Sequence, residues 1–268
     1  MKKVLCIAEC CCDVIFGDLD RIPALGQEEY SRYFAVKAGG GANTAMGLAR
    51  LGVPTRFLTR LGNDLMGRLV LDCLVESGLD IESFTPEEGV QTPVSAVMST
   101  KKDRCFVSFM GSGGAFITTD RLEKEIAACD HVHTYIGYCL AYPIVRLCQK
   151  YGKTLSLDTS WTEHEKPGKL EPVLSYASLF TPNDKEAMQI TGAKTPQAAL
   201  EILADICPGT VVTIGEKGSI AMISGKIHHQ DCISYGPVLD STGAGDMFCA
   251  GLIYGYCRGL ALEKCMEI

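Results

Sequence analysis

The sequence lacks any run of basic residues. It contains 25 Lys and Arg against 32 Asp and Glu among 268 residues, which gives a formal net charge of -7. Proteins that bind nucleic acid present a cluster of cations to its phosphates, so we expect no nucleic-acid partner. An acidic protein that binds a polyanion must neutralise it locally, with backbone N–H groups, a few cations or a bound metal ion.

Long hydrophobic runs are also missing. The longest apolar stretch near the C-terminus, Met247 to Cys257, is bounded by Asp246 and Arg258 and is too short to cross a bilayer. The apolar residues at the N-terminus are interrupted by Glu9 and Asp13, too early for the hydrophobic core of a signal peptide. We therefore expect a cytoplasmic protein with no membrane partner.

Cysteine, in contrast, is abundant, with 14 residues. A disulfide framework is typical of short secreted chains, whereas this chain is long and shows no signal peptide. Most of the cysteines, such as Cys6 and Cys249, lie in apolar segments where the thiol behaves as a small hydrophobic group. Cys129, His131 and His133 alternate along one expected strand, but zinc there would lack a fourth ligand. We expect reduced, mostly buried thiols.

Short buried strands alternate with amphipathic helices along most of the chain. Strands are expected at 3–8, 55–60, 131–136, 154–158, 179–181 and 211–214, and helices at 42–51, 64–76, 142–150, 196–207 and from 242 onwards. Strands joined by helical crossovers form parallel sheets that are covered on both faces. The sequence therefore predicts a single α/β domain over residues 1–268, with a Rossmann-like, mostly parallel sheet between helices.

Two stretches, at about 14–38 and 93–110, interrupt this alternation. Both contain the alternating residues of antiparallel strands that lie outside a main sheet. We expect these two insertions to form a small β-sheet lid over the site. An exposed sheet of this kind can also pair with a second copy of the chain, which would give a homodimer through the lid.

The strongest motif runs from Gly243 to Asp246 at the start of the last expected helix. Small residues at 243–245 let the backbone turn tightly and bring its N–H groups close to an anion, which the helix dipole also favours. An acid just inside that helix reaches the same point. Phosphoryl transfer needs this pairing of amides with a carboxylate that accepts the proton of the attacking hydroxyl. The alternative is a glycine-rich helix start with an ordinary Asp.

A second glycine cluster, Gly39 to Asn43, opens another helix. It is not a dinucleotide fingerprint, because the position that needs the last glycine is Thr44. A P-loop is excluded too, since the glycine required upstream of Lys153 is replaced by Leu147. An amide beside glycines instead suits neutral hydroxyl groups, where Asn both donates and accepts. The alternative is that Asn43 caps the helix.

Four motifs occur here in an order that resembles the PfkB (ribokinase-like) carbohydrate kinases. They are the glycine cluster that ends at Asn43, the segments Asn183 to Glu186 and Val211 to Gly218, and the segment Gly243 to Asp246. The resemblance extends from the first strand to the C-terminus. It implies a kinase that transfers the γ-phosphoryl group of ATP to a hydroxyl of a small molecule.

The resemblance also implies a role for each matching residue. The base would be Asp246, and the anion hole would be formed by the backbone at Gly243, Ala244 and Gly245. Substrate hydroxyls would be held by Asp13, at the end of the first strand, and by Gly39, Gly40 and Asn43. The nucleotide would lie along Asn183, Glu186, Thr213, Gly215 and Gly218, with Glu186 organising Mg²⁺ indirectly. Asp240 and Thr242 match positions that bind a monovalent cation, often K⁺.

Three features depart from the family pattern. Ala8 stands where the first strand usually ends in glycine, and Cys11 stands where Asn is common. The chain ends at Ile268, where family members usually continue with a helix and loop around the adenine and cation sites.

The glycine cluster also bears on the substrate. Kinases of phosphorylated sugars commonly carry a cation where this chain has Gly40, so an unphosphorylated sugar or sugar acid is favoured. A nucleoside is the alternative, with a base pocket supplied by Phe109 or Phe116. A sugar-binding protein that has lost catalysis is a further alternative, although intact Asp246 argues against it. A nicotinamide-dependent oxidoreductase would fit the sheet but lacks the fingerprint.

Overall fold

The computed structural model describes the whole chain except residues 82–85, 102, 113–116, 160–166, 234–235 and 237–241. Its strands are β1 (Val4–Ile7), β2 (Cys10–Leu19), β3 (Tyr33–Gly40), β4 (Thr55–Leu58), β5 (Val94–Thr100), β6 (Arg104–Phe109), β7 (His131–Tyr135), β8 (Thr154–Asp158), β9 (Leu179–Phe180), β10 (Val211–Thr213), β11 (Ser219–Ile223) and β12 (Lys226–Gln230). Its helices are α1 (Ala42–Arg50), α2 (Leu65–Glu76), α3 (Thr119–Ala128), α4 (Ile136–Ala141), α5 (Ile144–Tyr151), α6 (Pro167–Leu174), α7 (Asp184–Thr191), α8 (Pro196–Ile206), α9 (Ala244–Cys257) and α10 (Leu262–Met266), with a 3₁₀ turn η1 (Gly215–Lys217).

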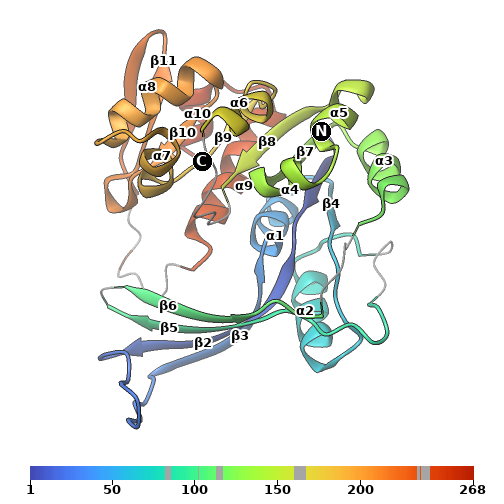
Figure 1. Cartoon of the computed structure of the whole chain (residues 1–268), viewed down its shortest axis with the longest axis vertical. Helices are drawn as coiled ribbons and strands as arrows, with labels where there is room; N and C mark the ends of the chain where they lie inside the picture. The colour runs from blue at the N-terminus through green and yellow to red at the C-terminus, as the bar shows by residue number, and fades with distance from the viewer. Residues whose placement is uncertain (82–85, 102, 113–116, 160–166, 234–235, 237–241) are drawn as a thin grey trace.

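A five-stranded sheet with the order β4-β1-β7-β8-β9 forms the centre of the molecule, and every pair in it is parallel. Isolated parallel bridges from Phe180 to Thr210 and from Asn183 to Thr213 continue this sheet toward β10. There the chain turns back into the antiparallel strands β11 and β12. The α/β fold with a mostly parallel sheet is therefore confirmed (Figure 1).

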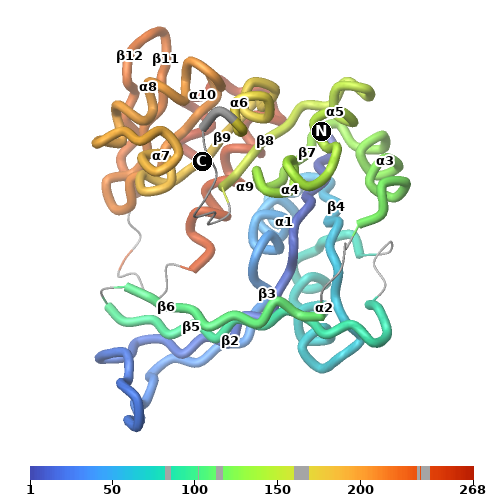
Figure 2. Tube along the Cα trace, in the orientation of Figure 1, coloured from blue at the N-terminus to red at the C-terminus, as the bar shows by residue number. Residues whose placement is uncertain are grey.

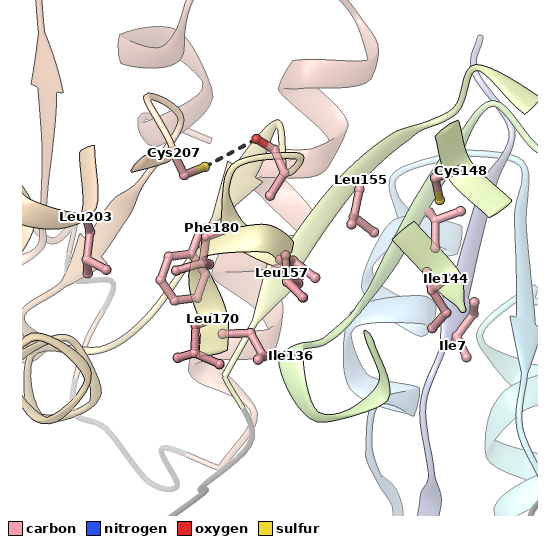
Figure 3. Packing of buried hydrophobic residues seen from close by; sticks show 14 of the residues in the cluster. Ile7, Ile136, Ile144, Cys148, Leu155, Leu157, Leu170, Phe180, Leu203 and Cys207 are labelled. Atoms are coloured by element: carbon pink, nitrogen blue, oxygen red, sulfur yellow. Dashed lines mark hydrogen bonds between the residues drawn. The ribbon is translucent and has the colours of Figure 1, made fainter. Parts of the chain in front are cut away.

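Both faces of this sheet are buried, as expected for a parallel sheet between helices. Along β1 the side chains alternate, so that Leu5 and Ile7 enter one core cluster while Val4 and Cys6 enter the other. Figure 3 shows part of the first cluster, where Leu157 from β8 lies among residues of neighbouring elements. All 14 cysteines lie in the described part of the chain as free thiols, and most are buried, as predicted.

A separate four-stranded sheet has the order β3-β2-β5-β6 and lies at the lower edge of the molecule in Figure 2. The two insertions do form this sheet, but two details differ from the prediction. Its central pair, β2 and β5, is parallel, because the chain passes through β4 and α2 between them and enters β5 in the same direction. Strand β2 also begins at Cys10, before the predicted start of the insertion at Val14.

Local signals account for several helix starts. Asp64 caps α2 by accepting a hydrogen bond from the N–H of Gly67, and Thr195 caps α8 ahead of Pro196. The helix expected at 142–150 is confirmed as α5, which begins directly after Pro143, whereas α4 was not predicted. The sequence reading also missed α3, α7, β11 and β12, which are short or polar elements with weak periodicity.

A polar chain crosses the central sheet between β7 and β8. His131 Nε2 and His133 Nδ1 lie 2.8 Å and 2.9 Å from the same hydroxyl, Ser156 Oγ, and His131 Nδ1 lies 2.8 Å from Thr154 Oγ1. Both histidines therefore bond to hydroxyls of β8. Burial lowers the pKa of His131 to about 3 and that of His133 to about 4, so both rings are neutral.

These lowered pKa values predict a pH-dependent stability. In the unfolded chain histidine has a pKa of 6.5, so it is protonated below that pH, whereas the folded rings stay neutral down to about pH 4. The free energy of unfolding therefore falls as pH drops from about 6.5 toward 4. His133→Asn keeps a hydrogen-bonding group beside Ser156 and removes one histidine that takes up a proton in the unfolded chain. We expect urea unfolding of the variant between pH 6 and pH 4.5 to lose less stability, by up to about 1.4 kcal/mol per pH unit. His229→Asn changes an exposed histidine that lies outside the hydrogen-bonded group of His131, His133 and Ser156, and is the matched control. Equal slopes for wild type and His133→Asn would contradict the prediction.

Candidate active site

Helix α9 begins with a turn whose conformation depends on glycine. Gly243, the residue before the helix, has a φ of 78°, in the left-handed region that favours glycine. Ala244 and Gly245 are exposed, and a Cβ added at Gly245 would meet no atom within 4 Å. The first N–H groups of a helix have no acceptor within the helix, so this turn offers amides to an anion in open space.

Asp246 follows in the same turn and is held by three side chains. Its Oδ2 accepts a hydrogen bond from Asn43 Nδ2 at 3.1 Å, and its Oδ1 accepts from Thr44 Oγ1 at 3.4 Å and from the Tyr135 hydroxyl at 3.5 Å. Burial nevertheless raises the pKa of Asp246 to about 6, against the effect of these donors. Asn43 is not a helix cap, because Gly41 occupies that position in α1.

Asp13 comes close to this carboxylate from the small sheet. It lies within β2, and not at the end of the first strand as predicted, because β1 ends at Ile7 and a new strand begins at Cys10. Its side chain is buried, and its negative charge contributes to the raised pKa of Asp246.

Two glycines of the cluster are required by close contacts. A Cβ on Gly39 would lie 2.1 Å from Asp13 Oδ2, so only glycine leaves room for that carboxylate. Gly40 has a φ of 62°, and a Cβ there would lie 2.8 Å from the carbonyl oxygen of Glu9. The structure thus brings together Asp13, Gly39 and Gly40 with the start of α1.

The segment from Asn183 to Glu186 forms a reciprocal cap at the start of α7. The Asn183 side chain accepts a hydrogen bond from the N–H of Glu186 at 2.9 Å, and Glu186 Oε2 accepts from the N–H of Asn183 at 2.8 Å. The N–H of Thr213 donates to the carbonyl of Pro182, which ties this turn to β10. Gly215 and Gly218, both with positive φ, turn the chain directly after β10.

The sequence reading missed Asp158, which ends β8 at the same edge of the sheet. Its Oδ2 accepts a hydrogen bond from the thiol of Cys249, with Sγ at 3.6 Å. Burial raises the pKa of Asp158 well above its ordinary value, and the charges of Asp246 and Glu186 raise it further. Burial also raises the pKa of Glu186. The available signal was an acid directly after the buried strand residues 155–157.

These acids fit a magnesium ion that is bound mainly through water and phosphate. Asp158, Glu186 and Asp246 concentrate negative charge that a divalent cation would offset. Among the described residues, no group of three His, Cys, Asp or Glu side chains is close enough to form a metal cage. Mg²⁺ usually keeps several waters and bridges substrate phosphates, so such a cage is not required. Asp240 lies outside the described residues, and the predicted K⁺ site with Thr242 stays a prediction.

Comparison with known proteins identifies the family. The model for the pfkB family of carbohydrate kinases matches residues 1–268. The chain belongs to this family. It is 27% identical to a ribokinase from Arabidopsis thaliana over 94% of this chain and 70% of that protein. It is 26% identical to a nucleoside kinase from Methanocaldococcus jannaschii over 99% of this chain and 87% of that protein.

Solved structures show the same fold. The structure of Arabidopsis thaliana ribokinase complexed with ribose and ATP has a TM-score of 0.81 and 22% identity, over 99% of this chain and 89% of that one. An adenosine kinase from Sinorhizobium meliloti has a TM-score of 0.83 and 20% identity, over 99% of this chain and 90% of that one. Membership of the pfkB family makes the chain a kinase. No helix in the described part of this family member is long and apolar enough to cross a membrane.

The raised pKa of Asp246 predicts a stability effect that is independent of activity. A folded pKa of about 6, above the ordinary 3.8, means that ionised Asp246 destabilises the fold as pH rises through 6. We expect Asp246→Asn to raise the free energy of unfolding at pH 8 by up to about 3 kcal/mol, and by little at pH 4. Chemical denaturation at the two pH values measures this difference.

Asp64 provides a control of opposite sign. Its carboxylate accepts hydrogen bonds from the N–H groups of Gly67 and Thr92. Although burial acts in the other direction, these bonds lower its pKa. Asp64→Asn is therefore expected to lose stability at pH 8. A loss of stability in Asp246→Asn as well would show that its carboxylate is not strained by burial.

Proposed function

We propose that this pfkB-family kinase phosphorylates a hydroxyl of a small unphosphorylated sugar or sugar acid with ATP. The observation that carries the proposal is the position of Asp246. Its carboxylate lies in the first turn of α9, directly after the exposed backbone of Ala244 and Gly245, and close to buried Asp13. A buried acid, the exposed backbone at a helix start and a second buried acid therefore lie together, which supports the proposal.

The reaction follows from this arrangement. The substrate hydroxyl passes its proton to Asp246 while its oxygen forms a bond to the γ-phosphorus, and the bond from that phosphorus to ADP breaks. The amides of Gly243, Ala244 and Gly245 stabilise the charge on the transferred group. A pKa of about 6 leaves Asp246 ionised at neutral pH, yet makes it a stronger base than an ordinary carboxylate.

The nucleotide is proposed to lie along the turns after β9 and β10. Asn183, Glu186, Thr213, Gly215 and Gly218 border these turns, and related structures contain ATP or ADP. When bound, Mg²⁺ would neutralise phosphate charge. Glu186 and Asp158 supply the negative charge that would hold the ion through its water shell.

The sugar is proposed to bind between the glycine cluster and the small sheet. Asp13 and Asn43 would bond its hydroxyls, and Gly39 and Gly40 would allow close approach of the backbone. Gly40 supplies no cation for a substrate phosphate. The small sheet would act as a lid that closes over the sugar and keeps out water, which would otherwise accept the phosphoryl group.

A nucleoside substrate remains the second candidate, because nucleoside kinases are among the relatives. The strand register weakens one part of it. Cys12 pairs with Val94 and Val94 with Phe109, so Phe109 lies on the face of the small sheet opposite to Asp13. Phe106 shares the face of Asp13 and is the better candidate for contact with a base. Phe116 lies outside the described residues.

We also propose a homodimer in which the face of the small sheet opposite to Asp13 packs against a second copy. Two neighbouring rows across the four strands are entirely apolar: Phe34, Phe16, Met98 and Cys105, and Val36, Val14, Ala96 and Val107. Val14 and Val36 pack partly against the core of the chain itself, whereas Phe34 is 60% exposed and Val107 66% exposed, so the outer part of these rows remains accessible. A second copy would bury it.

The kinase proposal is tested by ADP release from Mg-ATP across a panel of sugars, sugar acids and nucleosides. We expect at least one sugar or sugar acid to be turned over, with kcat/KM falling below about pH 6 as Asp246 takes up a proton. Asp246→Asn should reduce kcat by about 10²- to 10⁴-fold while substrate binding is largely retained.

Asp72→Asn, at an exposed acid of α2, is the matched control and should keep full turnover. Unaltered turnover in Asp246→Asn would remove Asp246 as the base. Sugars that raise thermal stability without any turnover would instead support the inactive binding protein.

The dimer is tested by sedimentation of wild type and Phe34→Asp. The charge should make burial of this surface unfavourable, so the variant is expected to be monomeric at concentrations where the wild type is a dimer. Tyr30→Asp, at an exposed residue outside both apolar rows, controls for added charge. A monomeric wild type would exclude the proposal.

A further inference from the structure

The two oxygens of Asp246 are not equivalent. Oδ1 receives both hydroxyl contacts, from Thr44 and Tyr135, whereas Oδ2 receives only the amide of Asn43 among the bonds of the described residues. A carboxylate oxygen has two lone pairs directed outward in its plane. Oδ1 is therefore approached by two hydroxyls, at 3.4 Å and 3.5 Å, whereas Oδ2 keeps one lone pair for a further donor. A substrate hydroxyl would be that donor.

The two hydroxyls on Oδ1 differ in their freedom. Thr44 Oγ1 lies 3.3 Å from the backbone carbonyl of Asp246 and 3.4 Å from Oδ1, so its single proton is shared between two acceptors. The Tyr135 hydroxyl has one acceptor, Oδ1, in the described structure. Burial raises the pKa of Tyr135 well above its ordinary value, and the charge of Asp246 raises it further. The phenol therefore stays protonated and remains a donor.

The fold fixes the ring of Tyr135. The residue ends β7 and precedes the first residue of α4, so its backbone belongs to two regular elements. A Cβ on Gly41 would lie 3.4 Å from its Cε2, which means that the glycine cluster packs on the ring edge. On the other sides lie the ring of His133, with centroids 6.3 Å apart, and the ring of Tyr138, with centroids 6.4 Å apart.

We infer that Tyr135 is a positioning residue for the proposed reaction: its hydroxyl holds Oδ1 of Asp246, so that Oδ2 faces the substrate and receives the proton. The inference rests on the proposed kinase function. Tyr135 does not touch the reacting atoms and acts only through Asp246. Its role is distinct from that of Asn43, which binds the oxygen that takes the proton.

The surroundings explain why such a donor is needed. Asp13 from β2 adds negative charge beside Asp246. This charge favours the protonated form of Asp246, as does burial, which is the larger cause. Donors on the carboxylate oppose this by stabilising the ionised form. Loss of the Tyr135 hydroxyl should therefore make Asp246 harder to ionise.

Tyr135→Phe tests the inference, with Tyr138→Phe as the matched control. Tyr138→Phe also removes a hydroxyl from the same group of rings, but that oxygen accepts from the N–H of Glu9, and the side chains that bond Asp246 are Asn43, Thr44 and Tyr135. With the sugar that is turned over fastest in the panel, we expect Tyr135→Phe to lower kcat about three- to tenfold at pH 7, with KM changed less than twofold. The acid limb of the pH–rate profile should move to higher pH by about 0.5 to 1 pH unit, less than a short hydrogen bond to a charged group would give, because this contact is 3.5 Å long.

Tyr138→Phe should leave the acid limb in place. A merely structural role of Tyr135 would lower thermal stability and activity without moving that limb, and this outcome would overturn the inference. Unchanged kcat and an unchanged limb would overturn it too.

A second measurement does not depend on the substrate. In protein labelled with ¹³C at the aspartate carboxyl carbon, the resonance of Asp246 is identified by its loss in Asp246→Asn. Its titration midpoint should lie near 6 in the wild type and higher in Tyr135→Phe. If no panel member is phosphorylated but this midpoint shifts, the kinase proposal fails while the Tyr135 contact stands. If phosphorylation is found and the midpoint is the same in both proteins, the Tyr135 inference fails alone.

Discussion

The site depends on one carboxylate that is held inside the protein in its less favourable, ionised form. Asp246 connects three elements that are far apart in the sequence: α9 carries it, α1 contributes Asn43 and Thr44, and β7 contributes Tyr135. Each donor is directed at a particular oxygen, so the relative positions of these elements decide which lone pair faces the site. Packing of α1 against α9, where a Cβ on Gly47 would lie 2.8 Å from Ala250, leaves little room for adjustment.

The parallel sheet explains why so many polar groups meet at this point. In such a sheet all carboxyl ends lie at one edge, and the turns that follow them form a crevice there. Tyr135 ends β7, Asp158 ends β8, and Asn183 follows β9 at the start of α7. The small sheet adds Asp13 from outside this order. Its one parallel pair, β2 with β5, places the two insertions side by side although α1, β4 and α2 lie between them in sequence.

Sequence alone was sufficient where a signal is local. Glycines before Asn43 and Asp246 mark the starts of two helices, whereas the equally local reciprocal cap at Asn183 and Glu186, which starts α7, was not predicted. The sequence was insufficient where the partner is remote. Asp158 and Tyr135 are ordinary strand-end residues until the fold brings Asp246 to them. Asp13 was assigned to the end of the first strand, whereas β1 ends at Ile7 and Cys10 already begins β2, which pairs with the remote strands β3 and β5.

Burial and hydrogen bonding act in opposite directions on Asp246, and a base for hydroxyl groups needs both. Burial alone would make the carboxylate basic but protonated, whereas donors alone would keep it ionised and weakly basic. The balance at a pKa of about 6 gives a group that is ionised at neutral pH and more basic than an exposed aspartate. The charge of Asp13 shifts this balance toward protonation. A phosphate-bound Mg²⁺ would shift it back, because its charge has the opposite sign. Arrival of the nucleotide would therefore favour the ionised base just when a substrate hydroxyl has to lose its proton.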